Sequence, residues 1–300
     1  MGFNRGMSVI RPVFPREGDL IAIVAPSSPF DVDRYEAGRA FLASRYRLRV
    51  RDDLLARQGF LAGDDARRLA ELRDALFDAE VKAVIAARGG YGATRVASSI
   101  DWGAFARAPK WIVGFSDVTA LHVEASRVGV SSMHASMVAS LGASDPSARA
   151  AFVDALEGNP LAAWEGLTTV VEGRAIGPVF GGNLALLSAC AAAGRLVVPQ
   201  GAIVFLEDCT ERPYRVDRML TSLLLGGHLA RAAAVVVGDF TDCDPGPDGV
   251  TVEAVLRERL STLSVPLVFG APFGHGARNR PFVLGARAEV IASEHARVVF

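Results

Sequence analysis

Short, continuous apolar runs alternate with helical patterns through the first half of the chain. The runs Leu20–Ala25, Ala83–Ala87 and Trp111–Phe115 predict buried strands, because a strand covered on both faces is apolar at every position. Over residues 32–44 and 65–77, apolar side chains recur at helical spacing. Strands that alternate with helices indicate a parallel sheet covered by helices on both faces.

The second half of the chain is richer in strands. The expected strands are Thr168–Val171, Ala175–Val179, Ile203–Leu206, Ala232–Val237, Leu267–Phe269, Phe282–Leu284, Ala288–Ile291 and Val298–Phe300, and the expected helices are Leu184–Ala193, Pro213–Leu223 and Val250–Leu260. This pattern predicts a mixed α/β domain with more antiparallel character. We place the boundary in the stretch between Gly158 and Gly173, which gives domains over residues 1–165 and 166–300.

Composition narrows the classes of function. The chain has 300 residues, and its 32 basic and 33 acidic residues leave a net charge of −1, so no large basic field favours nucleic acid or an anionic membrane. No apolar run reaches the 18 or so residues of a membrane span, and no secretory signal is evident near Met1. We therefore expect a cytoplasmic protein. Its three cysteines show no C-x-x-C spacing, which argues against a disulfide framework or a zinc site.

A serine stands where an expected strand meets an expected helix. Ser116 directly follows the apolar run, and the helix opens at Asp117. Such a turn exposes the hydroxyl and leaves the first N–H groups of the helix unpaired, so that they can stabilise an oxyanion. Gly114 matches the first glycine of G-x-S-x-G, but Val118 replaces the second. Ser116 is a candidate nucleophile, with helix capping as the alternative.

A glycine-rich loop follows another expected strand. In Arg88-Gly89-Gly90-Tyr91-Gly92, three glycines within four positions let the backbone approach a ligand closely. The loop could offer a backbone N–H to an anion, or it could be a tight turn only. It matches neither G-x-G-x-x-G nor the Walker A pattern, which argues against a nucleotide binder.

Carboxylates and a histidine complete the candidates. Glu207 and Asp208 end an expected strand and Glu211 follows closely; these acids could orient a histidine or be ordinary loop and helix-terminal charges. His275 lies between two glycines after another expected strand. It is a candidate catalytic base, with a simple turn as the alternative. No H-x-x-x-H spacing occurs, so a zinc hydrolase is not expected. His134 has the features of a core histidine.

Three of these candidates fall at strand ends. Ser116 belongs to the first expected domain, whereas Glu207 and His275 belong to the second. A catalytic triad is defined by geometry rather than by chain order. These residues could therefore meet in a cleft between the two domains, which is a common place for a pocket.

At this point the sequence resembles a known family, the LD-carboxypeptidases or muramoyltetrapeptide carboxypeptidases, which are serine peptidases and include the microcin C immunity peptidases. Six stretches carry the resemblance, in the family's order and over nearly the whole chain. They are Leu20–Pro29 (LIAIVAPSSP), Ala87–Arg95 (ARGGYGATR), Gly114–Leu121 (GFSDVTAL), Gly177–Leu187 (GPVFGGNLALL), Phe205–Leu220 (FLEDCTERPYRVDRML) and Gly270–Gly276 (GAPFGHG).

The resemblance implies a triad of Ser116, Glu207 and His275, with the carboxylate at Glu207 in preference to Glu211. It also implies an oxyanion hole from the backbone N–H groups of Asp117 and Gly90, and no metal or cofactor. The implied fold is a Rossmann-like N-terminal domain with a smaller β-rich C-terminal domain, commonly in a homodimer.

The substrate implied by the resemblance is a cytoplasmic murein tetrapeptide, from which terminal D-Ala is released during peptidoglycan recycling. Arg88 is a candidate clamp for the substrate carboxylate, or a member of a structural ion pair. The chain has His134-Ala135-Ser136-Met137 where many relatives have His-Gly-Pro, which leaves the exact peptide open. The alternatives are an immunity-type peptidase that hydrolyses peptidyl-nucleotide antibiotics, and a non-catalytic protein that binds cell-wall fragments.

Overall fold

The first half of the chain supplies five strands of a six-stranded sheet. The computed structural model describes residues 9–300, and its first sheet has the order β11-β5-β4-β3-β1-β2. Strands β1 to β5 run parallel, and only β11 is antiparallel, against β5. The bounds are β1 (Leu20–Val24), β2 (Arg47–Arg49), β3 (Val81–Ala86), β4 (Trp111–Gly114), β5 (Ser132–His134) and β11 (Phe282–Leu284).

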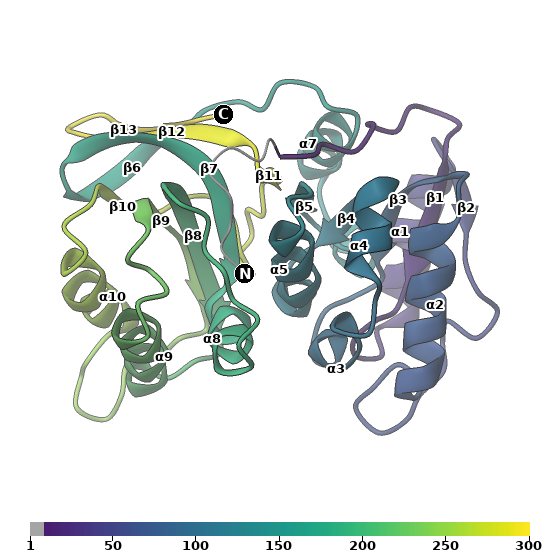
Figure 1. Ribbon diagram of the computed structural model, residues 1–300, viewed down its shortest axis with the longest axis horizontal. Helices are drawn as coiled ribbons and strands as arrows, with labels where there is room; N and C mark the ends of the chain where they lie inside the picture. Colours follow the sequence, from purple (N-terminus) through teal and green to yellow (C-terminus); the bar gives the residue numbers. More distant parts are fainter. Residues whose placement is uncertain (1–8) are drawn as a thin grey trace.

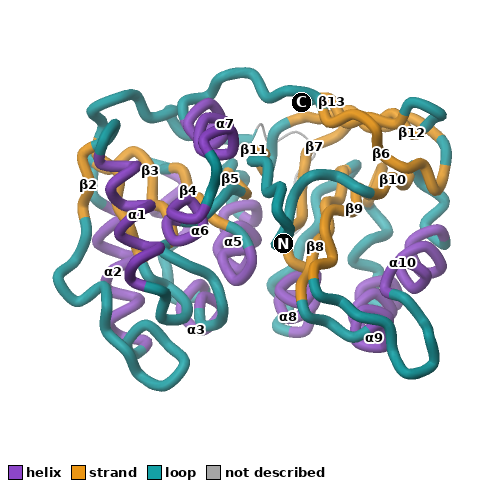
Figure 2. The backbone as a smooth tube through the Cα atoms, turned by 180° about the vertical axis from the view of Figure 1, so that it is seen from behind, coloured by secondary structure: helices purple, strands orange, loops and turns teal. Residues whose placement is uncertain are grey.

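Helices cover both faces of this sheet (Figures 1 and 2). Side chains alternate along β1, so that Ile21 and Ile23 pack toward α1, α6 and α7, while Leu20, Ala22 and Val24 pack toward α2 and α5. The continuous apolar run of this strand is thus explained by burial on both faces. The helices are α1 (Val32–Ala43), α2 (Asp65–Phe77), α3 (Ala93–Ala97), α4 (Trp102–Arg107), the 3-10 turn η1 (Ser116–Val118), α5 (Thr119–Arg127), α6 (Val138–Ala143) and α7 (Pro146–Leu156).

The second half closes into a seven-stranded barrel of order β10-β6-β13-β12-β7-β8-β9, with parallel and antiparallel pairs. Its core is rich in packed aromatic rings, among them Trp164, Phe205 and Phe273. The elements are β6 (Trp164–Val171), β7 (Gly173–Asn183), α8 (Leu184–Ala192), β8 (Ala202–Cys209), α9 (Pro213–Leu225), β9 (Ala232–Thr241), α10 (Val252–Ser261), β10 (Leu267–Phe269), β12 (Arg287–Ala292) and β13 (Ala296–Val299).

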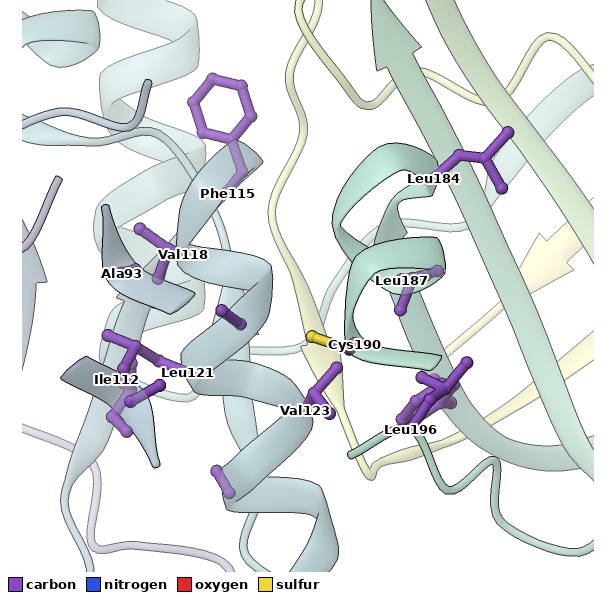
Figure 3. Close-up of a cluster of buried hydrophobic side chains, with 14 of the residues drawn as sticks. Ala93, Ile112, Phe115, Val118, Leu121, Val123, Leu184, Leu187, Cys190 and Leu196 are labelled. Atoms are coloured by element: carbon purple, nitrogen blue, oxygen red, sulfur yellow. The ribbon is translucent and has the colours of Figure 1, made fainter. Parts of the chain in front are cut away.

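The sheet and the barrel meet along α5 and α8, which pack against each other. Apolar side chains of both helices belong to one buried cluster; Figure 3 shows Leu121 and Val123 on α5 and Leu187 and Cys190 on α8. At the edge of this contact, the Arg195 guanidinium donates two hydrogen bonds of 2.6 Å to the buried carboxylate of Glu124. This interface fixes the position of the helix that follows Ser116 relative to the barrel.

The predicted fold class is confirmed: a parallel α/β sheet is followed by a smaller, β-rich mixed part. The structure corrects one detail, because Phe282–Leu284 pairs with β5 of the first sheet rather than with its neighbours in the chain. The expected domain boundary at residues 165/166 stays a prediction. Among the described residues, no helix is long and apolar enough to span a bilayer.

Candidate active site

Ser116 lies on a sharp turn after β4, where it is the first residue of the 3-10 turn η1. Its φ of 60° is in the left-handed region, which a non-glycine residue rarely adopts. Such strain persists where the surrounding structure imposes it, and it is frequent at functional sites. The N–H of Val118 closes the turn on the Phe115 carbonyl at 3.2 Å. The strand–serine–helix turn expected from the sequence is therefore present.

The glycine loop after β3 packs directly on Ser116. A Cβ atom at Gly89 would lie 3.1 Å from Ser116 Oγ, and one at Gly90 would lie 2.5 Å from Ser28 Oγ. Gly90 also has a φ of 103°, which disfavours any other residue. The loop is tied down by the Tyr91 N–H, which donates to Ser28 Oγ at 3.0 Å. A side chain at either position would therefore crowd a neighbouring serine.

Two backbone donors lie at this turn without acceptors. Within residues 9–300, neither the Asp117 N–H nor the Gly90 N–H donates a hydrogen bond. The Asp117 side chain is instead a structural acceptor, since the Ala93 N–H donates to its Oδ2 at 2.7 Å. Burial raises the pKa of this carboxyl, and contacts with Ser27, Ala93 and the Arg68 charge oppose the rise.

Arg68, a fully buried residue of α2, holds the loops around the turn. Its Nη1 donates to the carbonyls of Pro26, at 2.6 Å, and Gly92, at 2.7 Å. Its Nη2 donates to Asp65. The loop after β1 and the loop after β3 are thus joined at one side of the site. Sequence reasoning missed this residue, because an arginine within a charged helix gives no sign of burial.

On the barrel side, Glu207 and His275 form a hydrogen-bonded pair. His275 Nδ1 lies 2.7 Å from Glu207 Oε2, and the glutamate is fully buried. With Nδ1–H donating to the carboxylate, the Nε2 of the neutral ring is left free to accept a proton. Gly274 makes room for the pair, since a Cβ there would lie 3.1 Å from Glu207 Cβ.

The environment of His275 shifts its protonation. Burial disfavours the charged ring, but contacts with Cys209 and with the Glu207 carboxylate outweigh it and raise the pKa of His275 to about 10. The negative charge of Glu207 thus stabilises an imidazolium at this position. A carboxylate that stabilises the protonated ring is what a histidine needs when it takes up a proton during a reaction.

The acids near Glu207 have other partners. Asp208 accepts hydrogen bonds from Asn183 Nδ2 at 2.9 Å and from the Ala185 N–H at 2.8 Å, at the N-terminus of α8. Burial and the Glu207 charge raise the pKa of Asp208 to about 6, against these hydrogen bonds. Glu211 lies 3.8 Å from Arg215 in an i,i+4 ion pair. Of the acids considered from the sequence, Glu207 is the one that contacts His275.

The serine turn and the histidine pair face each other across the interface. The ring of Phe115, next to Ser116, lies 4.9 Å from the His275 ring. The Asn183 N–H donates to Thr119 Oγ1 at 3.2 Å, and Asn183 pairs with Glu207 across β7 and β8. This contact links the helix after Ser116 to the strand that carries Glu207. Among residues 9–300, no hydrogen bond joins Ser116 to His275.

The other residues considered from the sequence have different partners. Arg88 donates to the Pro29 carbonyl at 2.6 Å rather than entering an ion pair. His122 is buried, with Nε2 2.9 Å from the Gly114 carbonyl, and burial lowers its pKa to about 4. His134 is fully buried at the end of β5. In the described part of the chain, no group of three or more His, Cys, Asp and Glu side chains is placed to hold a metal ion.

Comparisons with known proteins show which family the chain resembles. Residues 21–135 match the family model described as the LD-carboxypeptidase N-terminal domain, and residues 176–290 match the LD-carboxypeptidase C-terminal domain. A Bacillus subtilis protein named "Probable murein peptide carboxypeptidase" is 32% identical over 96% of this chain and 94% of its own. The murein tetrapeptide carboxypeptidase of Pseudomonas aeruginosa is 31% identical over 89% and 92%.

Solved structures share the fold of this chain over nearly its whole length. The muramoyltetrapeptide carboxypeptidase from Oxalobacter formigenes superposes with a TM-score of 0.84 at 28% identity, over 93% of this chain and 97% of that chain. The microcin C7 self immunity protein MccF superposes with a TM-score of 0.86 at 19% identity, over 96% and 97%. At that identity the second likeness concerns the fold alone.

Proposed function

The chain belongs to the LD-carboxypeptidase family of peptidases, and from that premise we propose that it releases the terminal D-Ala of murein tetrapeptides by serine catalysis. The observation that carries the proposal is the Glu207–His275 hydrogen bond of 2.7 Å, next to the Phe115 ring at the serine turn. A serine, a histidine and a buried carboxylate at one interface are the components of acyl transfer.

In the first half of the proposed reaction, Ser116 Oγ attacks the carbonyl carbon of the scissile amide. His275 Nε2 accepts the hydroxyl proton as the new C–O bond forms. Glu207 holds the Nδ1–H tautomer and stabilises the imidazolium. When the C–N bond breaks, His275 gives its proton to the departing D-Ala amine and an acyl-enzyme on Ser116 remains.

In the second half, water replaces the amine. His275 Nε2 takes a proton from the water as its oxygen attacks the acyl carbon, and then returns it to Ser116 Oγ as the ester bond breaks. The peptide product leaves with a new carboxylate. In each half of the reaction His275 takes up one proton and returns it, so water is the only co-reactant.

The two unpaired backbone donors suit the charge that develops in both tetrahedral intermediates. We assign the oxyanion hole to the N–H groups of Asp117 and Gly90, which lie on the turn of Ser116 and on the loop packed against it. Rigid donors of this kind stabilise the oxyanion without reorganisation at the moment of reaction. The fixation of the glycine loop by Ser28 and Arg68 supports this assignment.

The substrate assignment rests on the relatives. The names of the curated and solved relatives refer to murein peptide, murein tetrapeptide and muramoyltetrapeptide substrates. We extend this substrate class to the present chain, together with action in the cytoplasm and assembly as a homodimer. The last two stay predictions, to be checked by cell fractionation and by light scattering.

The proposal is tested by incubating the purified protein with L-Ala-γ-D-Glu-meso-diaminopimelate-D-Ala and following free D-Ala by mass spectrometry. We expect release by the wild type and none by Ser116→Ala, with Ser126→Ala in α5, the helix that follows the serine turn, as the matched control. Release that persists in Ser116→Ala would contradict the serine mechanism. No release by the wild type would overturn the substrate assignment, and cleavage of a peptidyl-adenylate instead would favour the immunity-type activity.

A further inference from the structure

His134 has surroundings that are unusual for a core histidine. It ends β5 and is fully buried. Its ring stacks on Phe282 with centroids 4.5 Å apart, meets Phe273 edge-on at 5.6 Å, and lies 5.6 Å from Phe115. The imidazole therefore sits among three aromatic rings that come from both halves of the molecule.

These three rings belong to the segments that carry the proposed catalytic groups. Phe115 precedes Ser116 and also contacts the His275 ring at 4.9 Å. Phe273 and Phe282 bracket the loop that contains His275. His134 thus contacts the serine turn on one side and both ends of the histidine loop on the other. His134 is therefore placed to influence the position of the serine turn relative to the histidine loop.

Unpaired polar atoms accompany the packing. Within the same loop, Asn279 Oδ1 accepts the Gly274 N–H at 3.2 Å. Its buried Nδ2 has no hydrogen-bond partner among the described residues, and the same holds for both ring nitrogens of His134. Burial lowers the pKa of His134 well below its usual value, the electrostatic influence of the neighbouring His122 and His275 adds to this, and the Asn279 side chain opposes it. The ring is therefore neutral and has a nitrogen that can accept from Asn279.

A histidine in this place has a cost for stability. A buried imidazole without full hydrogen bonding loses its interactions with water, whereas a phenylalanine would fill the same space among aromatic rings. Residues that lower stability beside a reaction centre are typical of positions kept for function. His122 differs, because its Nε2 has a partner in the Gly114 carbonyl.

We propose that His134 is a positioning residue, which holds the loop from Phe273 to Phe282 by ring packing, with the Asn279 amide able to donate to its free nitrogen, and so aligns His275 with Ser116. This inference rests on the proposed function, because it assumes that Ser116 and His275 react together. His134 touches neither the substrate nor the reacting atoms in this account. Its contribution is to restrict the loop on which the base is mounted.

The test separates the ring from its nitrogens. His134→Phe keeps an aromatic ring but removes the acceptor, while His134→Asn and His134→Gln each keep a polar atom near one of the two nitrogen positions. Asn279→Leu removes the other partner at similar volume. Tyr46→Phe is the matched control, because it removes a buried hydroxyl that donates to Glu157 at 2.8 Å, in the first half of the chain and away from the loop.

We expect His134→Phe to lower kcat by about 10-fold or more, since small misplacements of a catalytic group are costly, with KM within about twofold and an unchanged or higher Tm. Asn279→Leu should give a similar loss, the double variant should be no worse than either single one, and His134→Asn or His134→Gln should restore most of kcat. Tyr46→Phe should lower Tm and leave kcat unchanged. Full activity in His134→Phe, or additive losses in the double variant, would overturn the inference.

A second readout keeps this test independent of the substrate. A fluorophosphonate ester reacts with an activated serine, forming an O–P bond and releasing fluoride, and mass spectrometry locates the adduct. We expect His134→Phe and Asn279→Leu to slow labelling of Ser116 by a factor similar to that in kcat. If the wild type is labelled but releases no D-Ala, only the substrate assignment fails. Equal labelling rates in wild type and His134→Phe would overturn the positioning role.

Discussion

The serine side and the histidine side of the site are held in place by different means. Ser116 takes its geometry from neighbouring residues: the end of β4, a φ of 60° and the 3-10 turn that follows. Glu207 and His275 are 68 positions apart and meet because the end of β8 and the loop after β10 come together in the barrel. The nucleophile is thus placed by local backbone and the base by tertiary contacts.

This difference indicates how each side should respond to substitution. On the serine side, the supports are glycines and backbone groups in close contact, so the damage from a side-chain change should be confined to the turn. On the histidine side, the support is a buried charge and a loop, so a substitution should change protonation as well as position. The predictions below separate these two kinds of response, from the largest expected effect to the smallest.

The choice between two acids gives the largest contrast. Glu207→Gln should lower kcat by about 10³-fold or more, because the carboxylate that fixes the His275 tautomer is lost. Glu211→Gln should change kcat by less than about twofold, because Glu211 faces Arg215 at 3.8 Å rather than His275. Steady-state D-Ala release measures both variants. The reverse order of losses would move the catalytic carboxylate to Glu211.

On the serine side, Gly89→Ala should lower kcat by about 10²-fold. The new methyl group would lie 3.1 Å from Ser116 Oγ. A small displacement of the hydroxyl or of the neighbouring N–H donors lowers kcat by about this factor. Gly103→Ala is the matched control, because its nearest neighbour would be Asp101 at 3.4 Å in α4. If Gly89→Ala retains wild-type kcat with an unchanged pH profile, the packed glycine loop has no role in catalysis.

The pH dependence distinguishes the two sides. The proposed base is neutral His275, whose pKa is raised above 6.5, so kcat/KM should rise with pH along a limb set by this group. Glu207→Gln removes the charge that stabilises the imidazolium, so the pKa should fall and the limb should move to lower pH, with a lower maximum. Gly89→Ala should leave the limb in place. A limb at the same pH in wild type and Glu207→Gln would show that another group titrates.

The smallest effect is expected where the two sides are joined. Thr119→Val keeps the side-chain shape but removes the Oγ1 acceptor of the Asn183 N–H. Leaving that buried N–H without a partner should lower the free energy of unfolding by about 1–2 kcal/mol, and kcat should fall by a few-fold as Glu207 moves relative to Ser116. Thermal unfolding and D-Ala release measure the two effects. A loss of stability with kcat unchanged would show that this link does not position the site.

The same contrast explains how much could be predicted from the sequence. The main strands of the first sheet could be predicted because apolar runs such as that of β1 reflect burial on both faces. The serine turn also had a local signal. Short elements were missed: β2 is an exposed three-residue edge strand, and α7 begins with Asp145-Pro146, a capping signal that could have been recognised.

Contacts between residues far apart in the chain could not be predicted from the hydrophobic and polar pattern. Nothing local indicates that Phe282–Leu284 pairs with β5, that Arg68 is buried against two loop carbonyls, or that His134 contacts the His275 loop. Each depends on contacts between residues far apart in the chain. Glu207 and His275 entered the candidate list through strand-end position and family resemblance, and their pairing is a property of the folded barrel.

The central claim, that Ser116, Glu207 and His275 act as one unit across the interface, is tested most directly by a mutant cycle on D-Ala release. Ser116→Ala, His275→Ala, the double variant and the variant with Glu207→Ala added are compared by kcat. The account predicts that each of the first two losses is about as large as the loss in the triple variant, because members of a catalytic unit are strongly non-additive. Losses that multiply, as expected for independent residues, would contradict it.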